Sequence, residues 1–494
     1  MLRTGDEHLR GLRDGRAVYI GSERVADVTA HPAFREAARS VARLYDLKRD
    51  PAYREALSYE EEGERYAMHF LLPRSRDDLL RRMRAHKLIA AASYGLLGRS
   101  PDHVASFVAG MALQPEQLGA GGACGRRFAD NLRAYYEHAR RNDLYIAYAV
   151  IPPPGARDPN FSGRLYERSP TLRVTEEDNA GVTICGMKLL ATASVFADEV
   201  WIGNVQPVAP DRKKEAITCA VPINAPGLSL WSRKPFAPSV QHEFDNPLSF
   251  RFDESDCVVI FDKVKVPWER VFCHDDAPLS REIYIRTPSH SFGNHQANVR
   301  FWAKLELLLG LASKIVRAGN LDRVPAVRET LGRLAAMEAM LAGMIYGQCM
   351  DHEDLGNGYV AFNRRYMYGA LSWCTENYAA ICESIRELMG AGVFLMPADA
   401  SFLRDPGLRE TFDAYWATTS ASAVERLKLF RLAWDLLGSE FGARHAQYEK
   451  FYAGPSFVVR DHSYRECPWE RFHGIVDGLM RSYGEPAEPP STSA

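Results

Sequence analysis

Two histidines that lie close together in the sequence, His290 and His295, are well placed for acid–base chemistry. His290 lies two residues before the segment FGNHQANVRF at residues 292–301, and His295 lies within it. A run of helical apolar periodicity begins near Asn298, so both histidines are predicted to lie in a short turn that opens a long helix. Such a junction suits acid–base catalysis, because backbone donors and a rigid support converge there. The same spacing also fits a purely structural pair, with one histidine capping the helix and one paired in the core.

The chain that must position these side chains has 494 residues. This length predicts two or three domains. Its 61 basic and 63 acidic residues give a net charge of -2, which provides no general attraction to nucleic acid or to anionic membranes. We therefore expect small or specific partners, and neither nucleic acid nor membrane binding.

The cysteines and the first residues predict a cytoplasmic protein. Nine cysteines are scattered without a CxxC pair, which disfavours a zinc ribbon or a disulfide framework, and no metal site is predicted. The opening MLRTGDEHLRGLRDGR is charged and lacks the apolar run of a signal peptide. No stretch approaches the roughly 20 apolar residues that span a bilayer.

The pattern of apolar and polar residues changes along the chain in a way that predicts an α+β multidomain fold. Residues 1–143 are typical of a mainly helical domain, with charged amphipathic segments. Residues 144–276 contain short β-branched and aromatic runs separated by turn signals such as PPPG, which predicts a compact antiparallel β-domain. Residues 277–480 are again helical, and the Pro/Ser-rich tail at residues 481–494 is predicted to be disordered.

The C-terminal helical region is predicted to form an antiparallel four-helix bundle. Apolar residues recur there every three or four positions, as at Leu334, Met337 and Leu341. The long helices expected from this periodicity cover residues 302–318, 327–349, 362–389 and 421–438.

The order of helical, β and helical regions resembles the acyl-CoA dehydrogenase-like flavoproteins, and local motifs narrow the resemblance. They are GLLGRSPDH at residues 95–103, ADEVWIG at 197–203, IFDKVKVPWERVF at 260–272, GNHQANVRF at 293–301 and RLAWDLLGSEFGARHAQYEKFYAG at 431–454. These segments look like the oxygenase component of two-component flavin monooxygenases, the 4-hydroxyphenylacetate 3-monooxygenase and chlorophenol monooxygenase group. The resemblance extends from residue 2 to about residue 480. It implies an N-terminal helical domain, a middle antiparallel β-barrel domain and a C-terminal four-helix bundle.

The resemblance implies an aromatic hydroxylase that takes reduced FAD (FADH2) from a separate NAD(P)H:flavin reductase. With O2 the flavin forms a C4a-hydroperoxide, which inserts one oxygen into a phenolic or similarly electron-rich ring. Relatives associate through the long helices, so a homotetramer is expected. The chain has no GxGxxG motif after a strand and no P-loop, and the lack of a nicotinamide motif fits a division of labour between oxygenase and reductase.

Hydroxylation of this kind sets chemical requirements for the site. An electrophilic oxygen attacks a phenolate faster than a phenol, so the site needs a base near the phenol oxygen and a cation or donor that holds the anion. It also needs a dry pocket, since water promotes loss of hydrogen peroxide from the flavin.

The resemblance assigns these roles to particular residues. Arg99, in GRSPD, is expected to contact substrate and flavin, although an arginine in such a loop also fits a surface salt bridge. His290 is expected to be the catalytic base. Thr192, in LLATAS, is expected to hydrogen-bond the flavin near N5, although a strand threonine often has no such role. The substrate-side residues are His103, Tyr148, Val205 and Gln206. The cofactor-side residues are Tyr148, Pro154, Gly155, Ala156, Arg157, Thr192, Ser194, His295, Gly454, Pro455, Ser456 and Phe457. For His295 a structural role is an equal alternative.

The departures from the family indicate the substrate. Hydroxyphenylacetate hydroxylases have a tyrosine where this chain has His103, and a histidine where it has Tyr148. A pocket that has exchanged these donors is expected to hold 4-hydroxyphenylacetate differently. The segments GNHQANVRF and FYAGPSFVVRDHSYRECPWERF look more like the chlorophenol-type branch. A substituted phenol or a related electron-rich ring, free or tethered to a carrier, is therefore the expected substrate.

Two other functions are less well supported by the sequence. A 4-hydroxybutyryl-CoA dehydratase-like flavoenzyme has the same fold but holds a [4Fe-4S] cluster with three cysteines and one histidine. No cysteine lies near the corresponding segments, since the nearest are Cys124 and Cys273, and this disfavours the dehydratase. An interaction protein on an inactive scaffold would be expected to lose the polar site, whereas Arg99, Thr192 and His290 are all present.

Overall fold

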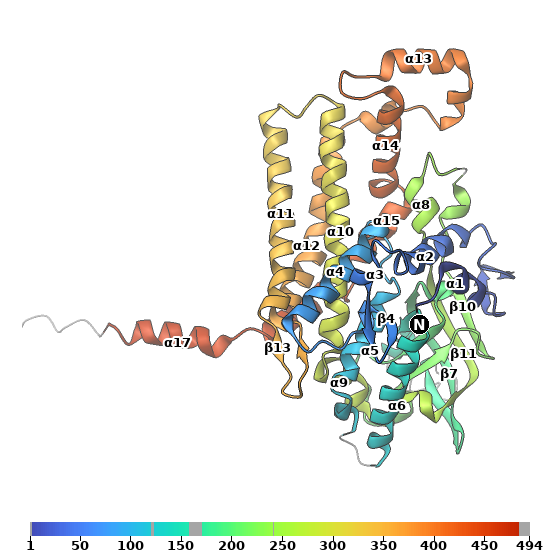
Figure 1. The fold of residues 1–494 in the computed structure, drawn as a ribbon, viewed down its shortest axis with the longest axis vertical. Coiled ribbons are helices and arrows are strands. Elements are labelled where there is room, and N and C mark those ends of the chain that lie inside the picture. Colours follow the sequence, from blue (N-terminus) through green and yellow to red (C-terminus); the bar gives the residue numbers. More distant parts are fainter. Residues whose placement is uncertain (1, 120–122, 158–169, 241, 484–494) are drawn as a thin grey trace, which may run out of the picture.

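A bundle of long helices and a group of β-strands lie side by side in the computed structural model, with shorter N-terminal helices between them (Figure 1). The structure describes residues 2–119, 123–157, 170–240 and 242–483. Over these residues the predicted order of helices, strands and a helical bundle is confirmed. The tail that was predicted to be disordered, residues 481–494, lies outside the described residues from residue 484 onward.

The N-terminal helices frame the GRSPD segment. They are α1 (Gly5–Gly11), α2 (Arg35–Leu47), α3 (Arg54–Leu57), α4 (Arg76–Ala92), α5 (Asp102–Ala112) and α6 (Ala123–Arg141). A short hairpin, β3 (Ser58–Glu61) with β4 (Glu64–Ala67), precedes α4. The side chain of Ser75 accepts a hydrogen bond from the backbone of Asp78 and so caps α4, and Pro101 directly precedes α5. The loop that contains Arg99 runs from the end of α4 to the start of α5.

Two sheets make up the β-region. The strands are β1 (Ala17–Ile20), β2 (Glu23–Val25), β5 (Ile146–Ala149), β6 (Arg173–Asp178), β7 (Gly181–Thr192), β8 (Glu199–Ile202), β9 (Ile217–Pro222), β10 (Leu228–Ser232), β11 (Asp256–Pro267) and β12 (Val271–His274). The six-stranded sheet has the order β2-β1-β10-β11-β7-β6, and the four-stranded sheet has the order β12-β9-β8-β5. A short helix, α8 (Pro247–Phe252), lies between β10 and β11 in the chain.

The sheets correct the sequence prediction in two respects. The expectation of antiparallel pairing holds for most neighbours, but β1 pairs with β10 and β5 with β8 in parallel. In addition, β1 and β2 come from the predicted helical domain and extend the sheet of the β-domain. Both differences concern partners far apart in the chain, which local patterning does not specify. The domain boundaries at residues 143 and 276 stay a prediction.

The C-terminal region forms the predicted bundle. Its helices are α9 (Ala277–Arg286), α10 (Ser289–Ala318), α11 (Pro325–Met350), α12 (Arg364–Met389), α13 (Pro406–Trp416), α14 (Ala423–Leu437), α15 (Glu440–Lys450), α16 (Ser456–Arg465) and α17 (Trp469–Met480), with a small hairpin of β13 (Glu353–Asp354) and β14 (Val360–Ala361). Helices α10, α11, α12 and α14 match the four predicted segments, and α10, α11 and α12 run alongside one another (Figure 1).

The start of α10 differs from the prediction. The helix begins at Ser289, not near Asn298, so the expected turn around the two histidines is wrong. Gly293 reads as a turn residue, but it lies within the helix, where an added Cβ would come 1.8 Å from a ring carbon of Phe107. This glycine therefore serves the close packing of α10 against α5.

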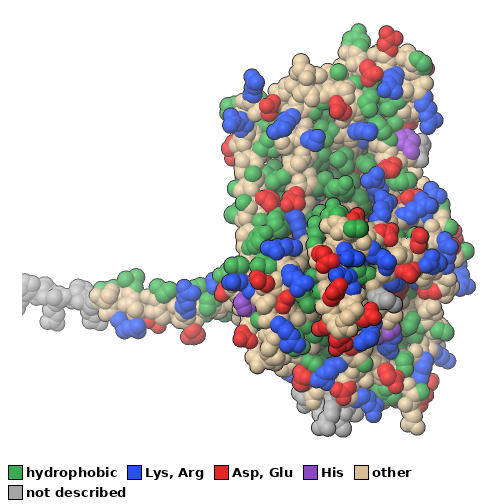
Figure 2. Space-filling model, viewed as in Figure 1, with side chains coloured by type: hydrophobic (Ala, Val, Ile, Leu, Met, Phe, Trp, Pro, Cys, Tyr) green, Lys and Arg blue, Asp and Glu red, His purple; other side chains and the backbone are tan. Residues whose placement is uncertain are grey.

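Helix α17 extends away from the body of the molecule (Figure 1). None of its residues is buried, and several apolar side chains are exposed along it (Figure 2). Among the described helices, none combines the length and the apolar character that crossing a membrane requires.

Candidate active site

Arg99 carries its charge into the interior between α4 and α5. Only 8% of the residue is exposed, yet within the described parts of the chain no carboxylate forms an ion pair with its guanidinium. The Nη1 atom lies 2.7 Å from His103 Nε2, and Nη2 donates to the carbonyl oxygen of Tyr452 at 3.0 Å. A buried cation whose partners are all neutral is suited to receive an anion.

Aromatic rings surround this guanidinium. Its Cζ atom lies 4.0 Å from the ring centre of Tyr452, 5.1 Å from that of Tyr148 and 5.6 Å from that of Tyr448. The ring of Phe107 lies 5.8 Å from Tyr148. Such rings attract a cation and exclude water, which provides the dry surroundings that the chemistry requires.

His103 is held as a neutral donor. Because the arginine N–H donates to Nε2, the hydrogen of the imidazole must be on Nδ1, and this nitrogen is buried without a partner among the described residues. Burial, and then the neighbouring Arg99, lower the pKa of His103 well below its ordinary value. An unsatisfied buried donor costs about 1–3 kcal/mol, so a bound oxygen acceptor would be favoured there.

His290 lies in the first turn of α10, near the same aromatic group. Its ring lies 6.3 Å from Phe107, and its Nδ1 atom is 2.5 Å from the hydroxyl oxygen of Tyr368. Burial, with a smaller effect of His462, lowers the pKa of His290 to about 3. The imidazole is therefore neutral at physiological pH and can accept a proton.

The structure separates the two histidines that the sequence places together. Residues five apart on an α-helix point about 140° apart, so His295 faces another direction than His290. The His295 ring stacks on Phe362 at 3.6 Å, and its Nδ1 atom lies 2.7 Å from the amide oxygen of Gln348. These contacts fit its structural alternative, and its contact with the flavin stays a prediction.

Thr192 ends β7 and is joined to the Arg99 loop through an ion network. Its hydroxyl lies 2.7 Å from Asp256, which is paired with Arg444. Arg444 also pairs with Glu254, whose carboxylate accepts from the backbone N–H groups of Gly98 and Arg99. Two predicted sites, one for the flavin and one for the substrate, are thus tied to one rigid network.

The remaining predicted residues, apart from the buried Ser194, lie on partly exposed segments. Pro154, Gly155, Ala156 and Arg157 form a single 3-10 turn after β5, and Gly454, Pro455, Ser456 and Phe457 lead into α16. Val205 is exposed and Gln206 is half-buried, while Ser194 is buried and donates to the backbone of Ala191. No hydrogen bond or ring contact joins the described side chains of this set, which exclude that of Arg157, to Arg99, and the roles of all these residues stay predictions.

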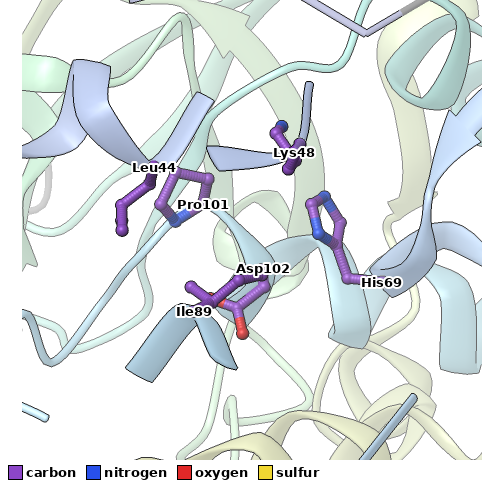
Figure 3. Close-up of a pocket in the computed structure, with 6 residues that line it drawn as sticks. All are labelled: Leu44, Lys48, His69, Ile89, Pro101 and Asp102. Atoms are coloured by element: carbon purple, nitrogen blue, oxygen red, sulfur yellow. The ribbon is translucent and has the colours of Figure 1, made fainter. Parts of the chain in front are cut away.

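Two small cavities lie among the described residues. One, of about 10 Å³, lies under the GRSPD loop between Lys48, His69 and Asp102, with Leu44, Ile89 and Pro101 completing its lining (Figure 3). A second of the same size lies beside Arg300 and Glu449. A space of about 10 Å³ accepts at most one water, so neither holds an aromatic ring.

Several supporting residues were missed by sequence reasoning. Asp102 accepts hydrogen bonds from Ser100 at 2.5 Å and contacts His86 at 2.7 Å, and so fixes the loop that carries Arg99. Tyr452 and Arg444 lie in a recognised motif but had no assigned role, and Tyr368 and Asp256 gave no signal. Their function depends on partners that are distant in the chain.

Comparisons with known proteins agree with this geometry. The family model described as 4-hydroxyphenylacetate 3-hydroxylase N terminal matches residues 4–273, and the model described as 4-hydroxyphenylacetate 3-hydroxylase C terminal matches residues 280–481.

Three relatives illustrate the similarity. The chain is 34% identical to the 4-hydroxyphenylacetate 3-monooxygenase oxygenase component of Thermus thermophilus, over 92% of both chains. It is also 34% identical to the oxygenase component of a 4-nitrophenol 2-monooxygenase from a Rhodococcus species, over 92% of this chain and 87% of the relative. A crystal structure of an oxygenase component of 4-hydroxyphenylacetate 3-monooxygenase, complexed with FAD and 4-hydroxyphenylacetate, is 32% identical and superposes with a TM-score of 0.90, covering 97% of this chain and 98% of that one.

Proposed function

The chain belongs to the 4-hydroxyphenylacetate 3-hydroxylase family, and on this basis we propose that its substrate is a substituted phenol held by Arg99. It is the oxygenase component of an FAD-dependent aromatic monooxygenase with an acyl-CoA dehydrogenase-like fold. Bound FADH2, with O2, supplies the electrophilic oxygen that enters the ring. Family membership also favours hydroxylation over the dehydratase alternative.

One observation supports the substrate site above the others. A buried guanidinium without a carboxylate partner among the described residues donates to Nε2 of His103, whose Nδ1–H is orphaned. A phenolate oxygen beside the guanidinium would balance the arginine charge. A second acceptor atom of the ligand, on the opposite side of the imidazole, would satisfy the orphaned donor. The aromatic rings around Arg99 would then pack against the substrate ring.

His290 is proposed to take the phenol proton. When its Nδ1–H donates to the oxygen of Tyr368, its Nε2 lone pair is free to accept that proton. A group with a pKa of about 3 is a weak base, so proton transfer depends on the phenolate being stabilised by Arg99 at the same time. The base and the cation would therefore work together.

The exchange of two side chains supports a substituted phenol. The rings of His103 and Tyr148 lie 5.6 Å apart, so the positions that differ from hydroxyphenylacetate hydroxylases are neighbours. The site keeps one imidazole and one phenol but exchanges their places. A ring with a substituent other than an acetate arm fits this rearrangement, and one relative is named for 4-nitrophenol.

The flavin is proposed to lie along the end of β7 and the neighbouring surface segments. Thr192, Ser194 and His295 would be on the isoalloxazine side, and the segments 154–157 and 454–457 would hold the rest of the cofactor. Thr192 fits such a role because its oxygen retains acceptor capacity beyond its bond to Asp256.

A separate reductase supplies the reduced flavin, as the name oxygenase component implies for the relatives. We further propose a homotetramer in the cytoplasm. Ile475, Leu479 and Met480 are exposed on α17, which extends from the body of the molecule (Figure 1), and a second copy of the chain would cover these apolar side chains. Sedimentation as a strict monomer at micromolar concentration would contradict this.

The activity is tested with a panel of phenols, reduced FAD and O2, followed by mass spectrometry. The expected product carries one additional oxygen, and the isolated chain given NADH alone should be inert. Robust NADH oxidation without a reductase, or no oxygenated product from any phenol, would contradict the proposal.

A further inference from the structure

The carboxylate of Asp256 receives hydrogen bonds on both oxygens. Arg444 donates from Nη2 to Oδ1 at 2.6 Å and from Nε to Oδ2 at 2.9 Å, and Arg233 donates from Nε to Oδ2 at 2.8 Å. The remaining contact is the Thr192 hydroxyl, 2.7 Å from Oδ1.

This arrangement decides where the hydrogen of that contact lies. Two arginines hold the carboxylate in its ionised form, and the pKa of Asp256 is lowered far below its ordinary value despite burial. An ionised carboxylate can only accept hydrogen bonds. The hydrogen between the two groups therefore belongs to Thr192, and its hydroxyl is committed to Asp256.

The backbone prevents Thr192 from turning elsewhere. Thr192 and Asp256 are paired residues of β7 and β11, and the next residue, Ala193, donates its backbone N–H to Ser255 at 2.7 Å. Threonine is also restricted at χ1 because its side chain is branched at Cβ. Toward any ligand, the Thr192 oxygen therefore offers lone pairs and no hydrogen.

We propose that Asp256 is a positioning residue that makes Thr192 an acceptor and thereby selects the reduced flavin. This inference rests on the proposed function, in which Thr192 lies near N5 of the isoalloxazine. In reduced flavin N5 carries a hydrogen and can donate to Thr192, whereas in oxidised flavin N5 is a bare acceptor. Two acceptors facing one another leave both without a hydrogen, which disfavours the oxidised cofactor.

The test compares the dissociation constants of oxidised and anaerobically reduced FAD, measured by equilibrium titration. Wild-type protein should bind reduced FAD at least about tenfold more tightly, which corresponds to a shift of about 30 mV in the potential of the bound two-electron couple. Thr192→Val should weaken the binding of reduced FAD and leave the binding of oxidised FAD unchanged or tighter. Thr192→Ser keeps the hydroxyl and should keep the preference.

The direction in which Thr192→Val changes the dissociation constant of oxidised FAD distinguishes an acceptor-only Thr192 from a general binding contact. If Thr192→Val weakens the binding of oxidised FAD as much as that of reduced FAD, Thr192 is not an acceptor only and the inference is overturned. A folded Asp256→Asn protein should bind oxidised FAD more tightly, because the amide can donate to Thr192 and so leave the hydroxyl hydrogen of Thr192 free to point at N5. If the ratio of the dissociation constants of oxidised and reduced FAD is unchanged in this variant, Asp256 has no part in the selection. If wild-type protein binds neither form, the proposed function itself fails.

Discussion

The hydroxyl oxygen of Tyr368 lies 2.5 Å from Nδ1 of His290 and joins helix α12 to the first turn of α10. The Tyr368 ring is itself stacked on His462 at 4.7 Å, so its position is fixed from the far side. The direction of this hydrogen bond decides the role of His290. If Nδ1–H donates, the opposite nitrogen accepts a proton; if Tyr368 donates, His290 can only hold an anion.

His290→Ala is expected to slow aromatic hydroxylation by about 100-fold to 10,000-fold, the usual span for a lost general base. Raising the pH toward the pKa of the free phenol should partly restore the rate, because solvent then provides the phenolate. Because the pKa of His290 is lowered to about 3, the wild-type rate should show no loss from protonation of His290 between pH 6 and pH 8. Product formation across pH measures both effects, and a wild-type rate in the variant would place the base elsewhere.

Arg99→Ala is expected to lower kcat/KM by about 100-fold or more, because it removes a buried cation and its donors from the anion. High pH should not restore this loss, in contrast to His290→Ala, because the missing function is not proton transfer. Arg99→Lys should remain impaired, since an ammonium cannot bridge His103 and the Tyr452 carbonyl as the guanidinium does. The exposed Arg43→Ala serves as the control and should behave as wild type.

Exchanging the side chains at positions 103 and 148 is expected to change the substrate specificity. His103→Tyr and Tyr148→His should each impair hydroxylation, because each leaves two like rings side by side and, in the first case, removes the imidazole that accepts from Arg99. The double variant should recover activity and shift the ratio of kcat/KM toward 4-hydroxyphenylacetate relative to substituted phenols. Strictly additive losses in the double variant would contradict coupling between the two positions.

Acid should destabilise the fold through buried neutral histidines. His8 is fully buried, both of its ring nitrogens lack partners among the described residues, and burial lowers its pKa to about 3. The unfolded imidazole titrates near pH 6.5, so between about pH 6.5 and pH 3 the unfolded state binds more protons and stability falls as pH falls. The contribution of His8 is about 1.4 kcal/mol per pH unit well below pH 6.5.

Thermal unfolding between pH 5 and pH 7.5 measures this dependence. His8→Phe should make the midpoint temperature less sensitive to acid, because phenylalanine keeps the packing against Tyr45 without a titratable group. The exposed His473→Gln is the matched control and should leave the acid sensitivity as in wild type. Equal sensitivity in His8→Phe and wild type would show that His8 is not a source of it.

The sequence alone determined the order of the elements and the family. Apolar residues at three- and four-residue steps predicted α10, α11, α12 and α14 because helix formation on a buried face depends on local spacing. The GRSPD motif predicted a site role for Arg99 without any knowledge of its contacts, and this role stays a prediction.

Tertiary structure decided which of these residues meet. His290 and His295 are five residues apart in the chain but are turned away from each other by the helix, whereas Arg99 and Tyr452 are 353 residues apart and share a hydrogen bond. The pairing of Thr192 with Asp256 depends on the register of β7 and β11, and β1 joins its sheet through the distant β10. Periodicity reports only which face of an element is buried; the partner on that face is selected by packing and charge pairing between segments that are remote in sequence.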